Sequence, residues 1–325
     1  MIDLVAIDLG GTHIRFAMAS VAGGKVVELG DPVTLKSADY DGVPAAWAEF
    51  ERRSGSALPK AAALSVAGPV VDGSVKLTNL AWRIEQRLVE RDLGLDSLLV
   101  INDFEAVGNA VAIARPSDFE HLCGPAVDLP EAGTISIVGP GTGLGVAQLW
   151  RGDGDGDYRV VPCEGGHIGF APVDAFEDQL LAALRPQYGR VSVERVAAGP
   201  GISDICHALG GRDGPLSDAA EDQDIWTRGM AGGDEPARSA VERFCMILGS
   251  VAGDLALAHG ARGVVIAGGL GRRLAGFLPN SGFAERFVAK GRFSEANARL
   301  PVKIIMHPEP GLLGAAAAFA RVAGA

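Results

Sequence analysis

Two glycine-rich segments in this sequence each contain a threonine and follow an apolar stretch. The first is Gly10-Gly11-Thr12, and the second runs from Gly139 to Gly145 with Thr142 at its centre. Because glycine has no side chain, successive backbone N–H groups can converge on an anion, and the threonine hydroxyls can add donors. Asp8 precedes the first segment, where a carboxylate could hold Mg²⁺ through water. The matched pair predicts a clamp for nucleotide phosphates, although either segment alone is equally well explained as a tight hairpin turn.

The spacing of the glycines excludes three common phosphate loops. The Walker A loop requires Gly-x-x-x-x-Gly-Lys-Ser/Thr, and no such run is present. The dinucleotide-binding fingerprint requires Gly-x-Gly-x-x-Gly at the start of a helix, but Leu144 or Val146 stands where the third glycine belongs, and an alternating strand follows. The glycine loop of protein kinases fails on the same spacing. Two β-hairpins that face the phosphates from both sides fit better.

Asn102 and Asp103 form a second candidate site. They follow the apolar stretch 98–101, at the C-terminal end of a predicted strand, where open α/β sheets bind their ligands. Asn102 and Glu105 also have the spacing of a helix capping box. Spacing alone does not separate these explanations. Both can hold, because a cap fixes the backbone and still lets the Asp103 carboxylate face a ligand.

A third set, Glu164, His167 and Glu194, has the chemistry to bind a polyol. Carboxylates accept hydrogen bonds from vicinal hydroxyls, and an imidazole can donate or accept. Taken singly, His167 is better explained as a structural histidine, and Glu194 as part of a solvated helix face. No His-x-x-x-His pair or carboxylate triad surrounds them, so the pattern does not favour a metal site.

The elements expected to position these residues repeat along the chain. Strands are predicted at 2–9, 13–20, 25–29, 61–67 and 98–101, and again at 134–138, 144–150 and 158–161. Both halves therefore open with strand, glycine turn, strand, turn and strand. Further strands at 262–267 and 302–306 and helices at 105–114, 174–184, 201–209, 236–259 and 311–322 complete the pattern. The segment 210–222 is predicted to be the least structured loop.

Composition narrows the class of protein. The 325 residues are 48% hydrophobic and carry a net charge of −11, which fits a globular protein and disfavours nucleic acid or an anionic membrane as partner. The four cysteines are widely spaced, which favours a reducing compartment over a disulfide framework. With no signal-peptide pattern and no long apolar stretch, the expected location is the cytoplasm.

Six motifs occur in a fixed order along the chain. They are Ile7 to Arg15, Ile101-Asn102-Asp103-Phe104, Gly139 to Gly145, Glu164-Gly165-Gly166-His167, Ser192-Val193-Glu194-Arg195 and Ala267-Gly268-Gly269. Together they resemble those of the bacterial glucokinases, which belong to the hexokinase-like, actin-fold superfamily of sugar kinases. The resemblance covers nearly the whole chain and extends to Pro310-Gly311-Leu312-Leu313-Gly314 near its end. His13 departs from the family, which usually has asparagine there. The cysteine-rich zinc motif of related sugar kinases is also missing after His167, so the chain resembles the zinc-free glucokinases.

The resemblance implies a two-domain, actin-like (ribonuclease H-like) α/β ATPase fold with an interdomain cleft. The expected small domain is 1–110 completed by 308–325, and the large domain is 111–307. The implied reaction is ATP-dependent phosphorylation of D-glucose at its 6-hydroxyl, the entry step of glycolysis, in a cytoplasmic homodimer. Asp103 would be the catalytic base, and Asn102, Glu164, His167 and Glu194 would bind the sugar with it. ATP would be bound by Asp8, Gly10, Gly11, Thr12, Gly141, Thr142, Gly143, Gly268 and Gly269, with Mg²⁺ at Asp8.

Two rival functions can use the same scaffold. A sugar-sensing transcription factor would need a DNA-binding helix-turn-helix, but the first strand is predicted to begin at residue 2 of an acidic chain. An actin-like ATPase that acts on a protein is disfavoured by Glu164, His167 and Glu194, which suit a polyol.

Overall fold

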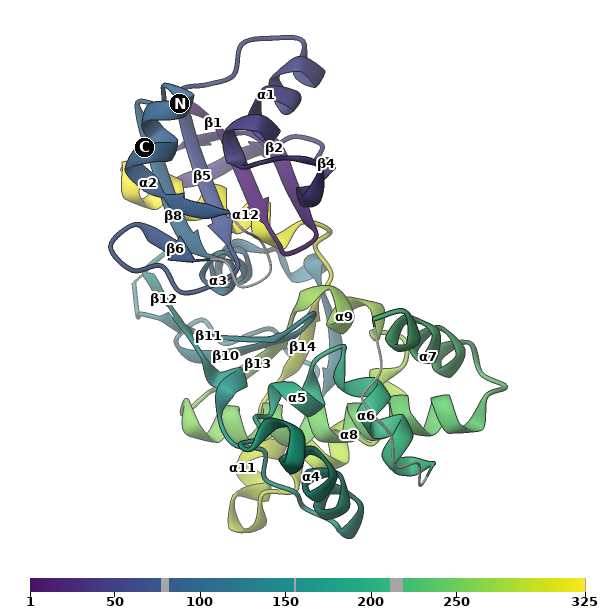
Figure 1. Ribbon diagram of the computed structural model, residues 1–325. Helices are drawn as coiled ribbons and strands as arrows, with labels where there is room; N and C mark the ends of the chain where they lie inside the picture. Colours follow the sequence, from purple (N-terminus) through teal and green to yellow (C-terminus); the bar gives the residue numbers. More distant parts are fainter. Residues whose placement is uncertain (77–81, 155, 211–218, 325) are drawn as a thin grey trace. The chain divides into compact units, whose positions relative to one another are not determined.

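The computed structural model describes residues 1–76, 82–154, 156–210 and 219–324. The chain divides into two compact units (Figure 1). Unit 1 consists of Met1–Arg115, Val160–Pro162 and His307–Ala325, and unit 2 of Pro116–Arg159 and Cys163–Met306. Each unit is built on a β-sheet with helices packed against it, which confirms the predicted α/β class.

The sheet of unit 1 has the order β3-β2-β1-β5-β8, and β4 also pairs with β2. β1 is antiparallel to β2 but parallel to β5, which is parallel to β8. Leu9, Val66 and Asn102 therefore lie in one row at the C-terminal edge of the sheet. The strands are β1 (Ile2–Leu9), β2 (His13–Ala22), β3 (Lys25–Leu29), β4 (Val33–Lys36), β5 (Ala61–Val66) and β8 (Ser97–Asn102).

The sheet of unit 2 has the order β12-β11-β10-β13-β14-β9 and repeats this connectivity. β10 takes the place of β1, because it forms a hairpin with β11 and a parallel pair with β13, which is parallel to β14. The internal repeat predicted from the sequence is confirmed. The strands are β9 (Phe119–Cys123), β10 (Gly133–Pro140), β11 (Leu144–Arg151), β12 (Tyr158–Cys163), β13 (Gly263–Ile266) and β14 (Val302–Ile305).

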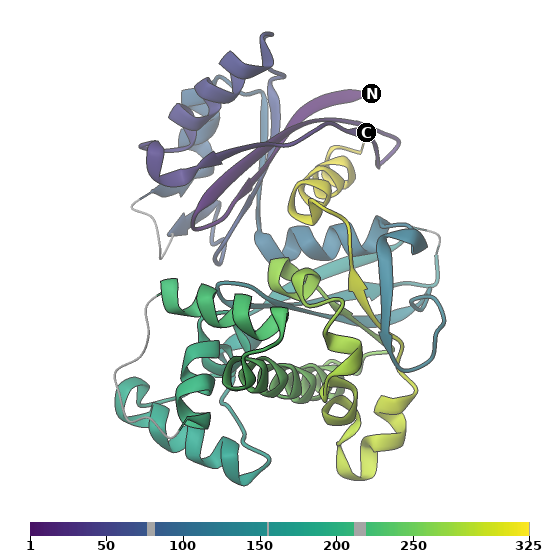
Figure 2. The same cartoon turned by 90° about the vertical axis from the view of Figure 1, so that its right-hand side faces the viewer.

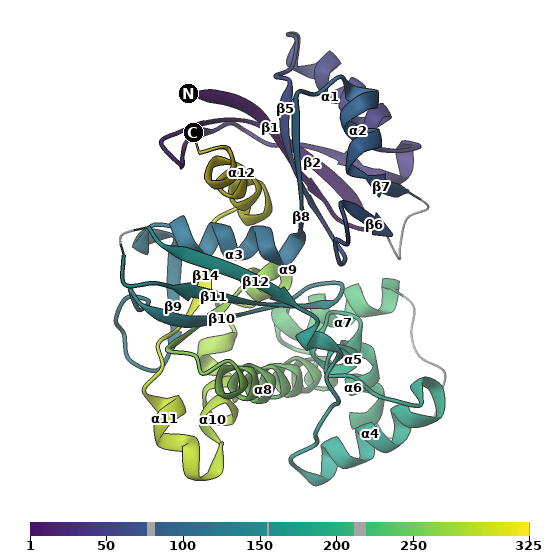
Figure 3. The same cartoon turned by 90° about the vertical axis from the view of Figure 1, so that its left-hand side faces the viewer.

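Both faces of the first sheet are covered by helices (Figure 3). Side chains alternate between the two faces along a strand. In β1, Val5, Ile7 and Leu9 pack in the cluster that contains residues of α1 (Val43–Ser54) and α2 (Gln86–Leu93). Leu4 and Ala6 pack on the opposite face in the cluster that contains residues of α12 (Pro310–Ala323). β1 is thus the central strand of a three-layered unit.

Helices α12 and α3 (Asp103–Ile113) lie side by side in unit 1 (Figure 2). The two backbones approach closely at Gly314, where a Cβ atom would stand 1.7 Å from the backbone oxygen of Ala106. Only glycine allows this contact between the two backbones. The helix that begins at Asp103 therefore rests on a segment from the far end of the sequence.

The core of unit 2 surrounds the long helix α8 (Glu235–Ala258), which packs beside α6 (Gly201–Leu209), α7 (Ala219–Ala231) and α10 (Phe283–Val288). The predicted loop at 210–222 is wrong for residues 219–222, which begin α7, while 211–218 lie outside the described residues. The buried Ile225 and Trp226 explain this helix, because they anchor it in the core. The other elements are β6 (Ser74–Lys76), β7 (Arg83–Glu85), α4 (Ala175–Tyr188), α5 (Glu194–Ala197), α9 (Gly268–Arg273) and α11 (Ser294–Ala298), with short 3₁₀ turns at Ser37–Asp39, Pro116–Asp118, Gly165–His167, Leu278–Asn280 and Gly291–Phe293.

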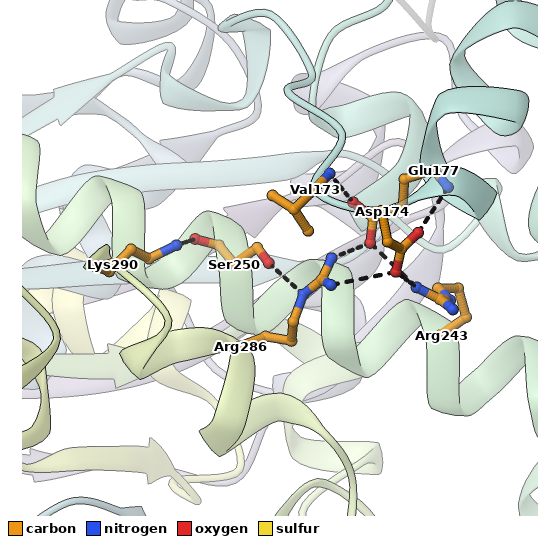
Figure 4. A network of polar contacts seen from close by, with 7 residues as sticks. All are labelled: Val173, Asp174, Glu177, Arg243, Ser250, Arg286 and Lys290. Atoms are coloured by element: carbon orange, nitrogen blue, oxygen red, sulfur yellow. Dashed lines mark hydrogen bonds and ion pairs between the residues drawn. The ribbon is translucent and has the colours of Figure 1, made fainter.

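A buried network of charges ties three helices of unit 2 together (Figure 4). Glu177 of α4 is only 1% exposed and pairs with Arg286 of α10 and Arg243 of α8. Asp174, the N-cap of α4, pairs with the same two arginines, and Arg286 also donates to the Ser250 hydroxyl at 3.0 Å. Each buried charge has an opposite partner, so the network fixes how these helices pack. Among the described residues, no helix is long and apolar enough to cross a membrane.

Candidate functional site

The first glycine turn joins β1 to β2. Gly10 donates its N–H to the carbonyl oxygen of His13 at 2.9 Å, and the Thr12 carbonyl accepts from the Ser37 N–H at 3.0 Å. Gly11 and Thr12 are exposed at the tip. His13, the residue that departs from the family pattern, therefore closes this turn through its backbone, which any residue can supply.

The second turn joins β10 to β11 and closes in a similar way. Gly141 donates its N–H to the Gly143 carbonyl oxygen at 2.8 Å, and Thr142 is exposed at the tip. Gly268 lies against the strand that enters this turn: its φ is +77°, and a Cβ atom would stand 2.6 Å from the Pro140 carbonyl oxygen. Gly268 is therefore required by both conformation and space, and it brings the start of α9 next to the second turn.

Asp8 lies in β1, with its side chain 19% exposed. Its Oδ1 accepts from the Ser65 hydroxyl and its Oδ2 from Arg15, each at 3.2 Å. Burial raises the pKa of the Asp8 carboxyl, while Arg15 and Ser65 act in the opposite direction. Arg15 also lies 3.6 Å from Glu309, the residue before α12. The carboxylate is thus held rigidly, with its charge balanced by a guanidinium.

These contacts decide how Mg²⁺ could be held. A direct bond from Asp8 to the ion would compete with Arg15, whereas contact through water would use the remaining lone pairs of the carboxylate. Among the described residues, no group of three or more His, Cys, Asp or Glu side chains could hold a metal ion. The residues fit a Mg²⁺ ion bound mainly by substrate phosphates and contacted by Asp8 through water.

Asn102 and Asp103 stand where β8 ends and α3 begins. Asn102 Oδ1 accepts from the N–H groups of Phe104 at 2.8 Å and Glu105 at 3.2 Å, and its Nδ2 donates to the Gly68 carbonyl at 2.9 Å. The Glu105 carboxylate in turn accepts from the Asn102 backbone. The capping box predicted for Asn102 and Glu105 is therefore confirmed. Asp103 Oδ1 shares the Phe104 N–H at 2.9 Å, so the carboxylate sits at the positive end of α3.

Glu164, His167 and Glu194 are brought together by a short backbone pairing. Gly169 forms an isolated bridge with Ser192, and Val193 donates its N–H to the Ile168 carbonyl at 2.9 Å. This pairing places the segment that carries His167 beside the first residue of α5, Glu194. The side chains of Glu164 and His167 are 64% and 57% exposed and lie 3.7 Å apart. They are accessible to a ligand, as sugar-binding groups must be.

A cavity of about 100 Å³ in unit 2 adds residues that the sequence did not single out. Thr142 and Glu194 line it together with Tyr188, Arg195 and Asp204. The Arg195 guanidinium lies 4.2 Å from the centre of the Tyr188 ring. Asp204 is 7% exposed, and its Oδ1 has no hydrogen-bond partner among the described residues. Burial, followed by the charge of Asp222, raises the pKa of Asp204 to about 6. The sequence around Asp204 is that of a regular helix, and it did not indicate a buried carboxyl with a raised pKa.

Each unit thus contains some of the site residues that were predicted from the sequence. In unit 1 the first turn, Asp8, Asn102 and Asp103 lie at or next to the C-terminal edge of one sheet. In unit 2 the second turn lies beside both Gly268 and Glu194, and backbone pairing brings Glu164 and His167 to the same region. The arrangement in unit 2 could bind an anion and a polyol, and that in unit 1 could hold an anion, a cation and a proton acceptor.

Known proteins match the chain along nearly its whole length. A family model described as Glucokinase matches residues 4–322. The glucokinase of Zymomonas mobilis subsp. mobilis is 48% identical over 318 residues, which cover 98% of each chain. A solved glucokinase from an Antarctic psychrotroph has a TM-score of 0.81 at 34% identity and 98% coverage of both chains. A ROK-family glucokinase from Streptomyces griseus, solved with glucose and AMPPNP, has a TM-score of 0.65 at 19% identity and covers 98% of this chain and 99% of its own. These similarities confirm the predicted actin-like α/β fold.

Proposed function

Because the chain belongs to the glucokinase family, we propose that it transfers the terminal phosphoryl group of ATP to the 6-hydroxyl of D-glucose. The observation that carries this proposal is the repeated hairpin turn. Two sheets of the same connectivity each present an exposed glycine-threonine turn, closed by a backbone bond from its first glycine. The Streptomyces griseus relative, whose structure holds glucose and AMPPNP, supports both substrates.

The nucleotide is bound by backbone groups. Gly10, Gly11 and Thr12 of one turn, and Gly141, Thr142 and Gly143 of the other, supply N–H and hydroxyl donors to the phosphates. Gly268 and Gly269 lie at the adenosine end, and the open space beside Gly269, where a Cβ atom would have no protein atom within 4 Å, lets the ligand approach the backbone. Asp8 would hold a Mg²⁺ ion through water, and the ion would supply positive charge to neutralise the phosphates.

The sugar is bound by carboxylate, amide and imidazole groups. Glu164, His167 and Glu194 hold hydroxyls of glucose, and Asn102 binds a further hydroxyl. Asp103 accepts the proton of the 6-hydroxyl as the oxygen attacks phosphorus, so that oxygen does not have to carry a positive charge. The start of α3 suits this role, because the helix fixes the carboxylate in one orientation.

The test is a panel of sugars with ATP and Mg²⁺, in which ADP release is followed by a coupled assay. Glucose, mannose and glucosamine are compared, and ³¹P and ¹³C NMR identify the phosphorylated carbon. We expect glucose to be the best substrate and C6 to be the site. An ADP signal that does not depend on any sugar would instead favour the ATPase alternative, and sugar binding without turnover would favour a sensor.

We also propose that the protein is a cytoplasmic homodimer that uses Mg²⁺. The support is the family resemblance together with the acidic, cysteine-poor sequence. Light scattering after gel filtration measures the mass against the 33.5 kDa of one chain. Activity in the presence of EDTA, with and without added Mg²⁺, tests the ion.

A further inference from the structure

Glu194 is bonded to the end of the second glycine turn. Its Oε2 accepts the backbone N–H of Leu144 at 2.9 Å, although the two residues are fifty positions apart. Leu144 is 4% exposed and Val193, the neighbour of Glu194, is also 4% exposed, so both sides of this bond are anchored in the core. The carboxylate therefore fixes the point at which the turn enters β11.

The same segment of chain holds the other end of the turn. Gly199 donates its N–H to the Gly141 carbonyl oxygen at 2.8 Å, and the Gly199 carbonyl in turn accepts from the Trp226 indole at 3.0 Å. At Gly143 a Cβ atom would lie 2.6 Å from Oε2 of Glu194. The turn is therefore held at both ends. The Gly199 N–H is hydrogen-bonded to Gly141 at its start, and the Glu194 carboxylate packs against Gly143 at its end.

The segment that carries Glu164 and His167 packs against Leu144, the residue whose N–H bonds to Glu194. A Cβ atom on Gly166 would stand 2.3 Å from the Leu144 carbonyl oxygen. Leu144 is therefore held from both sides, by Glu194 at its N–H and by the 164–167 segment at its carbonyl. The two glycines between Glu164 and His167 are explained by this packing, since Gly165 also lies against Val146.

We propose that Glu194 is a positioning residue that couples the sugar to the phosphate turn. This inference rests on the proposed function, in which Glu194 binds a sugar hydroxyl and the turn binds ATP. A carboxylate has two oxygens and can serve both purposes at once. Oε2 holds the Leu144 N–H, and Oε1 accepts from the sugar. A bound sugar fixes the Glu194 side chain, and the fixed side chain fixes the amides of Gly141, Thr142 and Gly143.

Such coupling is reciprocal by thermodynamic necessity. If glucose tightens nucleotide binding by some factor, the nucleotide tightens glucose binding by the same factor. Because Glu194 acts on the turn directly, its loss must also weaken nucleotide binding when no sugar is present. A residue that only contacts the sugar has no such effect, and this difference makes the proposal testable.

The first experiment measures the binding of AMP-PNP with Mg²⁺ in the absence of sugar, by calorimetry. Glu194→Ala removes the acceptor of the Leu144 N–H, and we expect about tenfold weaker binding. Glu164→Ala is the matched control, because Glu164 is also a proposed sugar ligand, but its carboxylate lies 3.7 Å from His167 and has no hydrogen bond to the turn among the described residues. It should bind AMP-PNP like the wild type. Glu194→Gln keeps an oxygen acceptor and should recover most of the affinity.

The reciprocal experiment measures the binding of glucose without nucleotide. Gly143→Ala places its methyl group against Oε2 of Glu194, whereas Gly141→Ala finds no protein atom nearer than 3.9 Å. We expect only Gly143→Ala to weaken glucose binding, by about fivefold or more, because it displaces the carboxylate. Neither glycine has a positive φ, so both variants should fold.

Equal AMP-PNP affinities for Glu194→Ala and Glu164→Ala, or equal glucose affinities for the two glycine variants, would overturn the coupling. If the Glu194→Ala protein does not fold, the reciprocal experiment still tests whether a change in the turn reaches the Glu194 carboxylate and the bound sugar. The proposed function is judged separately, by turnover of glucose and ATP by the wild-type protein. An active kinase with unchanged Glu194→Ala binding would therefore reject the coupling alone.

Discussion

Asn102 and Asp103 divide two tasks at the start of one helix. The Asn102 side chain accepts hydrogen bonds from the N–H groups of both Phe104 and Glu105, and the Glu105 carboxylate accepts one from the Asn102 backbone. Oδ1 of Asp103 accepts a second, shared hydrogen bond from the Phe104 N–H at 2.9 Å. Helix capping therefore depends on the first residue, so the carboxylate of the second can be altered with little effect on the helix.

Asp103→Asn should separate catalysis from folding. The amide keeps an oxygen for the Phe104 N–H but cannot accept the proton of the sugar hydroxyl. We expect kcat to fall by at least about 10²-fold, with near-normal binding of ATP and an unchanged melting temperature. Steady-state kinetics and a thermal scan measure both. Turnover within a few-fold of the wild type would show that Asp103 is not the base.

Asn102→Ala should give the opposite pattern. It removes the acceptor of two backbone N–H groups and the donor to the Gly68 carbonyl, so we expect a loss of about 1–2 kcal/mol in the free energy of unfolding, together with weaker glucose binding. Urea unfolding measures the first and calorimetry the second. Asn102→Asp is the control, because aspartate caps helices equally well. If Asn102→Asp were as unstable as Asn102→Ala, the lost stability would come from the bond to Gly68.

Gly141→Val should damage nucleotide binding and leave the fold intact. The nearest protein atom to a Cβ at this position is 3.9 Å away, so the side chain would project from the turn without displacing its neighbours. A large rise in the KM for ATP is expected, because the valine blocks the approach of phosphates to the backbone N–H groups. Gly276→Val, at an exposed position that is equally open, controls for the added β-branched residue. Unchanged ATP kinetics would remove the second turn from the phosphate site.

Asp204 should make the protein less stable as the pH rises. Its pKa is about 6 in the folded protein against an ordinary 3.8, so the folded state binds the proton more tightly than the unfolded state. The contribution of Asp204 to the free energy of unfolding then falls between about pH 4 and pH 6 and stays low above that range. Each pKa unit corresponds to about 1.4 kcal/mol, so the total is roughly 3 kcal/mol.

Asp204→Asn should remove this dependence. Urea unfolding at pH 4 should show little difference from the wild type, and at pH 7.5 the variant should be more stable, by up to about 3 kcal/mol. Asp224→Asn, an exposed substitution on α7 that removes one negative charge together with its surface ion pair to Arg228, serves as the control. If the difference in stability between Asp204→Asn and the wild type did not grow between pH 4 and pH 6, burial would not be raising the pKa of Asp204.

Local patterns in the sequence were enough to predict most of the elements. Strands Ile2–Leu9 and Lys25–Leu29 and helix Gly201–Leu209 begin and end where predicted, because glycines or prolines mark their limits and side-chain periodicity distinguishes strand from helix. The internal repeat could also be read, since both glycine turns follow buried strands. The edge strand Phe119–Cys123 was missed, because its partner, β14, lies far along the chain and its own residues are mostly polar or partly exposed.

Contacts within the candidate site were harder to predict. The capping box at Asn102 could be foreseen, since it depends on residues three apart. The hydrogen bond that the Leu144 N–H donates to the Glu194 carboxylate could not be foreseen, because it spans fifty positions and Glu194 considered alone resembles an exposed residue of a helix. The buried Asp204 likewise depends on how α6 packs beside α7 and α8, which no local pattern records.

The position of α12 bears on how the protein is made. This helix packs on α3, and Gly311 near its start lies against the Asp8 carboxylate, where a Cβ atom would be 2.6 Å from Cγ. Unit 1 is therefore completed by a segment that the ribosome synthesises after the whole of unit 2. Domains usually fold in the order in which they emerge. Here every residue of unit 2 is made before α12, so we expect the contacts that support Asp8 and Asp103 to be the last part of the site to form.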